Sequence, residues 1–155
     1  MKLEIKNRWT GEVIVEGDFS SLAELVTDAV RRKLNLTDAY LAGAKNIPAP
    51  AAAALMMCPE EGEFVGWKKC NGGVIVKLAI PADAKRSTAT TRKCRAEFVR
   101  VLEVFDAAVG ISQHDCKTEY RKGETVRCDK WEENRWIECA GGIHFFITRA
   151  EAEAY

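Results

Sequence analysis

FVGWKKCNGGVIVKLAI, the stretch at residues 64–80, places one apolar run on each side of Asn71-Gly72-Gly73. An Asn-Gly pair between two such runs is the strongest short-range signal for a β-hairpin. Alternate residues of the later run share one face of the strand, and here they are all apolar: Val74, Val76, Leu78 and Ile80. The stretch predicts antiparallel sheet in the later part of the chain.

Further strand patterns follow this hairpin. Residues 94–105 are rich in β-forming side chains and predict one long strand, and residues 143–147 predict a last strand. Thr148 and Glu151 then form the capping-box pattern that begins a short closing helix.

The chain before the hairpin begins with a second strand pair. Residues 2–9 alternate between charged and other side chains, which predicts a half-buried strand. A turn at Thr10-Gly11 and a strand at residues 12–16 complete the pair. Ser21 and Glu24 indicate the start of a helix whose apolar residues recur at helical spacing.

Residues 34–46, LNLTDAYLAGAKN, have a five-residue period with Leu36 and Leu41 at the centres of two units. The stretch resembles the pentapeptide repeat, in which each unit makes one side of a square β-helix. A solenoid needs several stacked repeats to bury its faces, so two units predict a fragment of one coil. The alternative is a helix end followed by a loop.

The expected fold class is α+β. It consists of an N-terminal β-hairpin plus helix, a short pentapeptide-repeat-like coil, and a mostly antiparallel β domain with a short C-terminal helix. The expected boundaries are residues 1–46 for the hairpin-helix unit with vestigial repeats, 47–58 for a linker or short helix, and 59–155 for a β-rich domain. We expect the last of these to fold without the first.

Composition narrows the possible functions. The 155 residues include 23 basic and 23 acidic side chains, and this balance argues against general nucleic-acid binding. No apolar stretch predicts a signal peptide or a membrane span, so we expect a cytoplasmic protein that does not bind membranes. The six cysteines lack the close spacing of zinc sites, and we expect reduced thiols, no metal and no cofactor.

Three segments of the later chain resemble one known family. They are PEEGEFVGWKK at residues 59–69, IPADAKRSTATTRKCR at 80–95 and GIHFFITR at 142–149. Together they are similar to a phage and prophage domain of unknown function, found C-terminal to pentapeptide repeats and an N-terminal strand-strand-helix unit. The resemblance implies a phage or prophage accessory protein and carries no established activity.

A second likeness concerns the end of the chain. Gly142 to Phe146, with Thr148, Ala152 and Tyr155 after it, is similar to the strand and helix beside the nicotinamide pocket of ADP-ribosyltransferase folds. It implies an alternative function, a degenerate or active ADP-ribosyltransferase-like nucleotide-binding enzyme. Those enzymes carry a His or Arg on the first strand and a late glutamate, which this sequence does not match. We therefore expect no transfer of ADP-ribose.

The segment Lys85 to Arg95 is the main candidate binding site, because cations and hydroxyls together suit a phosphate or another anion. The alternative is a solvated loop whose charges pair with Glu132, Glu133 and Glu138. The candidate ligand- or partner-binding residues are Lys85, Arg86, Ser87, Thr88, Thr91, Arg92, Lys93, Arg95, Trp67 and His144.

We therefore expect a non-enzymatic binding protein, to which no catalytic residue is assigned. Its expected partner is a host or defence-system protein, or a phosphate-bearing small ligand. A protein-binding module would expose an aromatic patch around Trp67, Trp131 or Trp136. Binding of a small ligand would instead need a concave pocket with a cationic lining.

Overall fold

The computed structural model describes all 155 residues and divides the chain into two compact units. Both units are discontinuous in sequence, because two short segments of the later chain belong to the first unit. Unit 1 consists of Met1–Met57, Thr88–Thr91 and Asn134–Glu138. Unit 2 consists of Cys58–Ser87, Arg92–Glu133 and Cys139–Tyr155.

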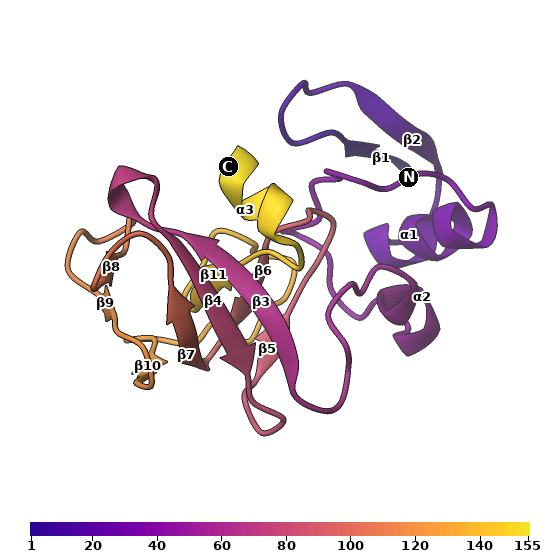
Figure 1. The fold of residues 1–155 in the computed structure, drawn as a ribbon. Coiled ribbons are helices and arrows are strands. Elements are labelled where there is room, and N and C mark those ends of the chain that lie inside the picture. Colours follow the sequence, from indigo (N-terminus) through magenta and orange to yellow (C-terminus); the bar gives the residue numbers. More distant parts are fainter. The chain divides into compact units, whose positions relative to one another are not determined.

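Unit 1 contains a two-stranded antiparallel sheet and two helices (Figure 1). Its elements are β1 (Lys2–Lys6), β2 (Val13–Asp18), α1 (Leu22–Arg31) and α2 (Ala49–Ala54). Ser21 caps α1 by accepting a hydrogen bond from the Glu24 backbone N–H at 3.2 Å. The Glu24 carboxylate accepts from the N–H and hydroxyl of Ser20. The predicted cap at Ser21 is therefore present, and the return bond of the capping box goes to the residue before it.

The five-residue period at residues 34–46 corresponds to a turn that occurs twice. The Ala39 N–H donates to the Leu36 carbonyl at 3.1 Å, and the Ala44 N–H donates to the Leu41 carbonyl at 2.9 Å. All four of these side chains are buried in the core of unit 1. The sequence period therefore marks a repeated turn with an apolar residue at each end.

The core of unit 1 also takes residues from the two inserted segments. Ala89 and Trp136 are buried in the same cluster as Ile5, Val15 and Leu25. Trp136 thus contributes to a core and not to an exposed aromatic patch. Of residues 47–58, expected to be a linker or short helix, 47–57 lie in unit 1 and include α2, and Cys58 begins unit 2.

Unit 2 is built on a four-stranded antiparallel sheet with the order β10-β7-β4-β3. The strands are β3 (Phe64–Lys69), β4 (Ile75–Ile80), β7 (Phe98–Val104) and β10 (Thr125–Arg127). The short 3-10 helix η1 (Asn71–Gly73) connects β3 to β4, and Gly72 adopts the positive φ of 69° that the turn requires. The predicted hairpin is confirmed.

The remaining strands of unit 2 form two smaller antiparallel sheets, ordered β11-β6-β5 and β8-β9. They are β5 (Arg86–Ser87), β6 (Cys94–Ala96), β11 (Ile143–Phe145), β8 (Gly110–Ile111) and β9 (Glu119–Tyr120). The helix α3 (Arg149–Ala154) follows, and Thr148 and Glu151 form the predicted capping box. The α+β fold class is confirmed.

The prediction of one long strand at residues 94–105 is wrong. The run is divided at Glu97 into β6 and β7, which belong to different sheets. Glu97 donates its N–H to the Lys85 carbonyl at 2.9 Å, and its own carbonyl accepts from the Cys128 N–H at 2.9 Å. These bonds connect Glu97 to two separate segments, so neither ladder continues through it.

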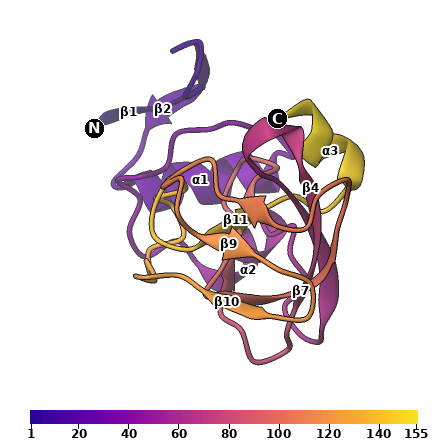
Figure 2. The same ribbon diagram turned by 60° about the vertical axis from the view of Figure 1, so that its left-hand side comes forward.

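A backbone bridge joins β3 to the chain that follows β11. Trp67 and Phe146 exchange two hydrogen bonds, of 2.8 and 2.7 Å. The Phe145 ring packs directly over Gly66, where a Cβ atom would lie 2.5 Å from the ring. β4 and β7 pair as neighbours in the four-stranded sheet, and Figure 2 labels both to the right of β9. The bridge positions β11 beside the end of β3, where the pocket described next is found.

Candidate functional site

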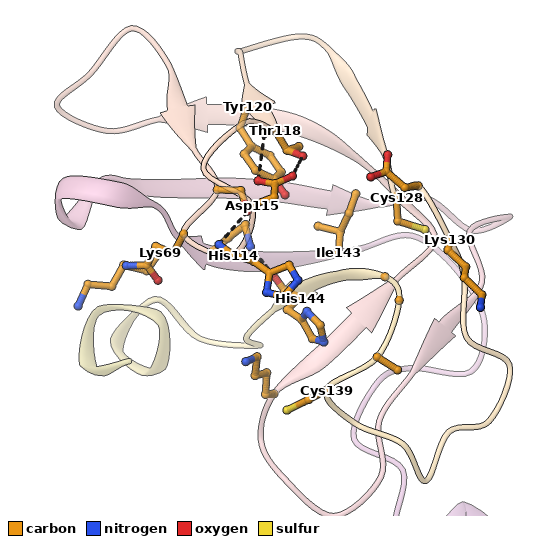
Figure 3. A pocket seen from close by; sticks show the side chains of 18 of the residues that line it. Lys69, His114, Asp115, Thr118, Tyr120, Cys128, Lys130, Cys139, Ile143 and His144 are labelled. Atoms are coloured by element: carbon orange, nitrogen blue, oxygen red, sulfur yellow. Dashed lines mark hydrogen bonds between the residues drawn. The ribbon is translucent and has the colours of Figure 1, made fainter.

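A pocket of about 680 Å³ opens in unit 2, a volume typical of small-ligand sites. Its lining comes from the end of β3, the loop at residues 112–118, the chain after β10, the segment 139–142, β11 and the C-terminus (Figure 3). The strand pairings hold several of these segments in place, so the pocket does not rest on a single loop. As a separate matter, none of the helices has both the length and the apolar composition that a membrane span requires.

Cations outnumber carboxylates in the pocket lining. The cationic residues are Lys68, Lys69, Lys93, Arg127 and Lys130, and the carboxylates are Asp115 and Asp129. Asp115 accepts hydrogen bonds from the Thr118 hydroxyl at 2.5 Å and from the N–H groups of Lys117 and Thr118. These bonds, that of the Thr118 hydroxyl foremost, hold the pKa of Asp115 far below its usual value. The Asp115 oxygens thus accept hydrogen bonds from residues of their own loop. The pocket lining as a whole has more cationic than acidic side chains.

Lys68 is the most unusual cation of the pocket. Its Nζ donates to the His144 carbonyl at 3.2 Å and lies 5.4 Å from the centre of the Tyr120 ring. No salt bridge involves it. Burial lowers the pKa of Lys68, and the nearby charge of Lys93 lowers it further. This amine is held in the pocket by neutral groups and lacks a carboxylate counter-ion.

Aromatic and aliphatic side chains form the rest of the lining. Tyr120 is only 2% exposed, and burial raises the pKa of its hydroxyl, which therefore stays protonated. Phe146 and Tyr155 pack with ring centres 5.2 Å apart, and Ile143 lies on β11. A ligand with both an anionic group and an apolar or ring-shaped part would match these two kinds of surface.

Metal-ligating residue types also occur in the pocket, namely His114, His144, Cys128 and Cys139. Figure 3 places His114, from the loop after β8, and His144, on β11, near the middle of the view. No three His, Cys, Asp or Glu side chains of the molecule are grouped so that they could hold a metal ion. All six cysteines are free thiols.

Of the ten candidate residues named from the sequence, Lys93 and His144 line the pocket. Lys93 donates to the Tyr155 hydroxyl at 2.7 Å, and its Nζ lies 4.5 Å from the centre of that ring. The other eight do not line the pocket: Lys85, Arg86, Ser87, Thr88, Thr91, Arg92, Arg95 and Trp67.

The cations among these eight bond to groups of unit 2. Lys85 forms a salt bridge with Glu133 at 2.5 Å, and Arg92 pairs with Glu151. Arg95 is 2% exposed and donates to the carbonyls of Glu132 and Gly141 at 2.6 and 2.9 Å, while its guanidinium packs on Trp131.

Arg86 makes the largest set of these bonds. Its guanidinium donates to the backbone carbonyls of Pro81 at 2.5 Å, Gly62 at 2.7 Å and Ala82 at 3.1 Å, among others. It also packs on the Phe64 ring at 5.1 Å. Arg86 therefore connects the turn after β4 to the chain that leads into β3.

The hydroxyl residues of the segment are mostly enclosed. Ser87 and Thr88 are buried, and the Thr88 hydroxyl accepts from the Met57 N–H at 3.0 Å within unit 1. The Thr91 N–H donates to the Glu138 carboxylate at 3.0 Å.

Trp67, on β3, is half-buried and stacks on Phe105, with the ring centres 5.9 Å apart.

The sequence reasoning missed Lys68, Tyr120 and the loop of His114. Lys68 and Lys69 end an otherwise apolar strand, and cations at a strand end beside a predicted turn could have been a signal. The positions of Tyr120 and His114 depend on β8 and β9, two-residue strands that no periodicity can reveal. Neither residue could have been assigned to the pocket from its neighbours in sequence.

Comparison with known proteins gives one match. Residues 54–152 match the model of a family of unknown function, DUF5758. No curated protein and no solved structure matches the chain. The family match covers more than half of the chain and nearly all of the pocket lining. On this evidence the chain belongs to the family of unknown function DUF5758.

Proposed function

We propose that this protein acts by binding a small phosphate-bearing ligand in the pocket of unit 2, without catalysing a reaction. The observation that carries the proposal is Lys68, whose partly buried ammonium faces the pocket without a carboxylate partner. A buried charge without a counter-ion is costly. A bound anion would supply the missing charge.

The number of available donors supports a phosphate group. A lysine ammonium has three N–H donors, and Lys68 uses one of them on the His144 carbonyl. Phosphate oxygens accept several charge-assisted bonds at once, and four more cationic side chains line the same pocket. Tyr120, Ile143 and Phe146 would contact an apolar or aromatic part of the ligand.

The biological setting is part of the same proposal. A phage or prophage accessory protein is suggested by the three segments at residues 59–69, 80–95 and 142–149, and the repeated turn of residues 34–46 is in keeping with a shortened pentapeptide-repeat coil. In that setting the protein would sequester an anionic small molecule in the host cytosol. A host or defence-system protein as the partner is the competing form of this proposal.

A second candidate function is nucleotide binding of the ADP-ribosyltransferase type. It is favoured by the position of β11 and the chain end, because His144, Phe146 and Tyr155 all line the pocket. These residues belong to the stretch that is similar to the nicotinamide side of those folds. Incubation with labelled NAD separates the two candidates, since the binding protein leaves NAD intact and a transferase or glycohydrolase releases nicotinamide.

The proposal is tested by isothermal titration with inorganic phosphate, pyrophosphate and adenosine 5′-monophosphate, with adenosine as the uncharged comparison. We expect at least one phosphate probe to bind, adenosine to bind more weakly than its monophosphate, and affinity to fall as salt screens the charges. Lys68→Met should weaken binding by about 10- to 100-fold, corresponding to about 1.5–3 kcal/mol for a charged hydrogen bond.

Lys122→Met is the matched control, because Lys122 pairs with Glu103 and does not line the pocket. It should bind the probes as the unaltered protein does. If no phosphate probe binds, or if Lys68→Met binds as well as Lys122→Met, the proposed site is wrong.

A further inference from the structure

We infer that the ligand of this pocket carries a carbonyl group as well as a phosphate, and that Lys68 forms a reversible imine with it. The inference rests on the proposed anion site and adds the chemical class of its ligand. With a ligand that carries a carbonyl, Lys68 reacts at that carbonyl while the other cations hold the phosphate. With a phosphate probe that lacks a carbonyl, the Lys68 ammonium pairs with the anion, as in the proposed function.

The geometry around Lys68 favours this chemistry. Lys68 lines the pocket from β3, and its Nζ donates to the neutral His144 carbonyl. The neighbouring cation whose charge acts on it is Lys93. A salt bridge would keep the amine protonated, and Lys68 has none among the ion pairs of the molecule. A lysine becomes a nucleophile when it is desolvated or placed next to another cation, and both conditions hold here.

The groups around Lys68 act on its protonation in opposite directions. Burial is the main cause that lowers the pKa of Lys68, followed in that direction by the charge of Lys93. Cys70 and Asp115 raise it. The Cys70 thiol has a pKa raised by burial to about 11 and is neutral near pH 7. The Tyr120 hydroxyl is neutral for the same reason. The lowered pKa increases the fraction of Lys68 that is neutral and able to react, while the remaining fraction is the ammonium that pairs with an anion.

Phosphate binding remains possible while Lys68 is neutral. Lys93, Lys69, Arg127 and Lys130 still line the pocket, and an arginine or lysine can hold a phosphate as a charged donor. The aromatic residues Tyr120 and Phe146 would lie against the carbon part of the ligand. The same pocket therefore offers a nucleophile, anion-binding groups and an apolar wall.

The reaction balances without an oxidant or reductant. The Nζ lone pair of neutral Lys68 attacks the carbonyl carbon, and the carbonyl oxygen takes up the two protons that leave the amine nitrogen. The oxygen departs as water, so that a C=N bond replaces the C=O bond. Hydrolysis reverses the step, and the ligand is held covalently without being consumed.

Two matched probes test the inference separately from the proposed function. Pyridoxal 5′-phosphate carries a phosphate and an aldehyde, whereas pyridoxine 5′-phosphate carries an alcohol in place of the aldehyde. The protein is incubated with limiting pyridoxal 5′-phosphate at pH 7, reduced with borohydride and mapped by peptide mass spectrometry. We expect Lys68 to be labelled faster than Lys122, because burial lowers the pKa of Lys68 and so raises the neutral fraction of its amine.

Lys68→Arg is the diagnostic variant, because it keeps the positive charge and cannot form the imine. Because it keeps the charge, it should bind pyridoxine 5′-phosphate more tightly than Lys68→Met does, and the rapid labelling should disappear. If the unaltered protein binds pyridoxine 5′-phosphate but Lys68 is labelled no faster than Lys122, the imine is wrong and the anion site stands. If neither phosphate probe binds, the proposed function fails together with the inference. If Lys68→Arg does not fold, the labelling rate of Lys68 in the unaltered protein, compared with that of Lys122, still tests whether Lys68 forms the imine.

Discussion

Two regions of the molecule contain similar side chains and differ in what those side chains contact. The segment Lys85 to Arg95 has five cations and four hydroxyls within eleven residues. Its cations bond to carboxylates, backbone carbonyls and a tyrosine hydroxyl of unit 2. The pocket gathers five cations from separate parts of the chain, and Lys68 among them has no acidic partner.

This difference shows that many charged side chains close together in a sequence need not be available to bind a ligand. Arginine makes several directional bonds at once, so a buried arginine such as Arg95 can hold segments of a fold together as well as bind a partner. Lysines drawn from different strands and loops meet only after folding. The three variants below test whether the segment is structural and the pocket is the binding site.

The largest expected effect comes from Glu138→Gln, which removes the charge that anchors Thr90 and Thr91. The Glu138 carboxylate accepts from the Thr90 N–H at 2.6 Å and the Thr91 N–H at 3.0 Å, and it pairs with Arg8 at 2.9 Å. The pair is buried, with side chains 12% and 6% exposed. Removing one partner of a buried pair costs about 3–5 kcal/mol, and urea unfolding of unit 1 should show a loss of this size.

Glu124→Gln serves as the control for that change, because Glu124 is exposed and forms no salt bridge of the molecule. Its unfolding free energy should match that of the unaltered protein. Equal stability of the two variants would contradict a structural role for residues 88–91.

An intermediate effect is expected from Arg86→Met, which keeps an apolar chain against Phe64 and removes the donors. The carbonyls of Pro81, Gly62 and Ala82 would lose their charged partner. The unfolding free energy should fall by about 1.5–3 kcal/mol, the range for a hydrogen bond to a charged group. Affinity for adenosine 5′-monophosphate should stay unchanged, since Arg86 does not line the pocket. Loss of affinity in the folded variant would make the segment Lys85 to Arg95 the binding site, as its sequence predicts.

Much of the fold could be predicted from the sequence, because turns, helix caps and hairpins depend on residues that are close together in the chain. The hairpin around Asn71-Gly72, the helix after Ser21 and the capping box at Thr148 were all predictable in this way. The division of the run at Glu97 was not, because it depends on backbone bonds to Lys85 and Cys128, which are distant in sequence.

The candidate site was less predictable than the fold. Lys93 and His144 were named from the sequence, one from the charge of its segment and the other from its strand. Lys68 was quoted only as part of a hairpin strand, since its special feature is that it forms no salt bridge in the folded chain. A sequence shows which charges exist, and only the folded chain shows which of them are paired.

The smallest effect is expected from Lys85→Ala, next to Arg86 in the same segment. Its ammonium bonds to the Glu133 carboxylate at 2.5 Å, which raises the pKa of Lys85 and lowers that of Glu133. Both side chains are largely exposed, at 55% and 72%. Water and salt screen such pairs, and their formation restricts two flexible side chains, so the net stabilisation is small. The melting temperature of Lys85→Ala should therefore equal that of the unaltered protein within the error of the measurement, at low and at high salt alike. Phosphate binding should also be unchanged, because Lys85 lies outside the pocket lining. A fall in melting temperature as large as that of Arg86→Met would mean that the charge of the segment, and not its hydrogen bonds to backbone carbonyls, stabilises this part of unit 2.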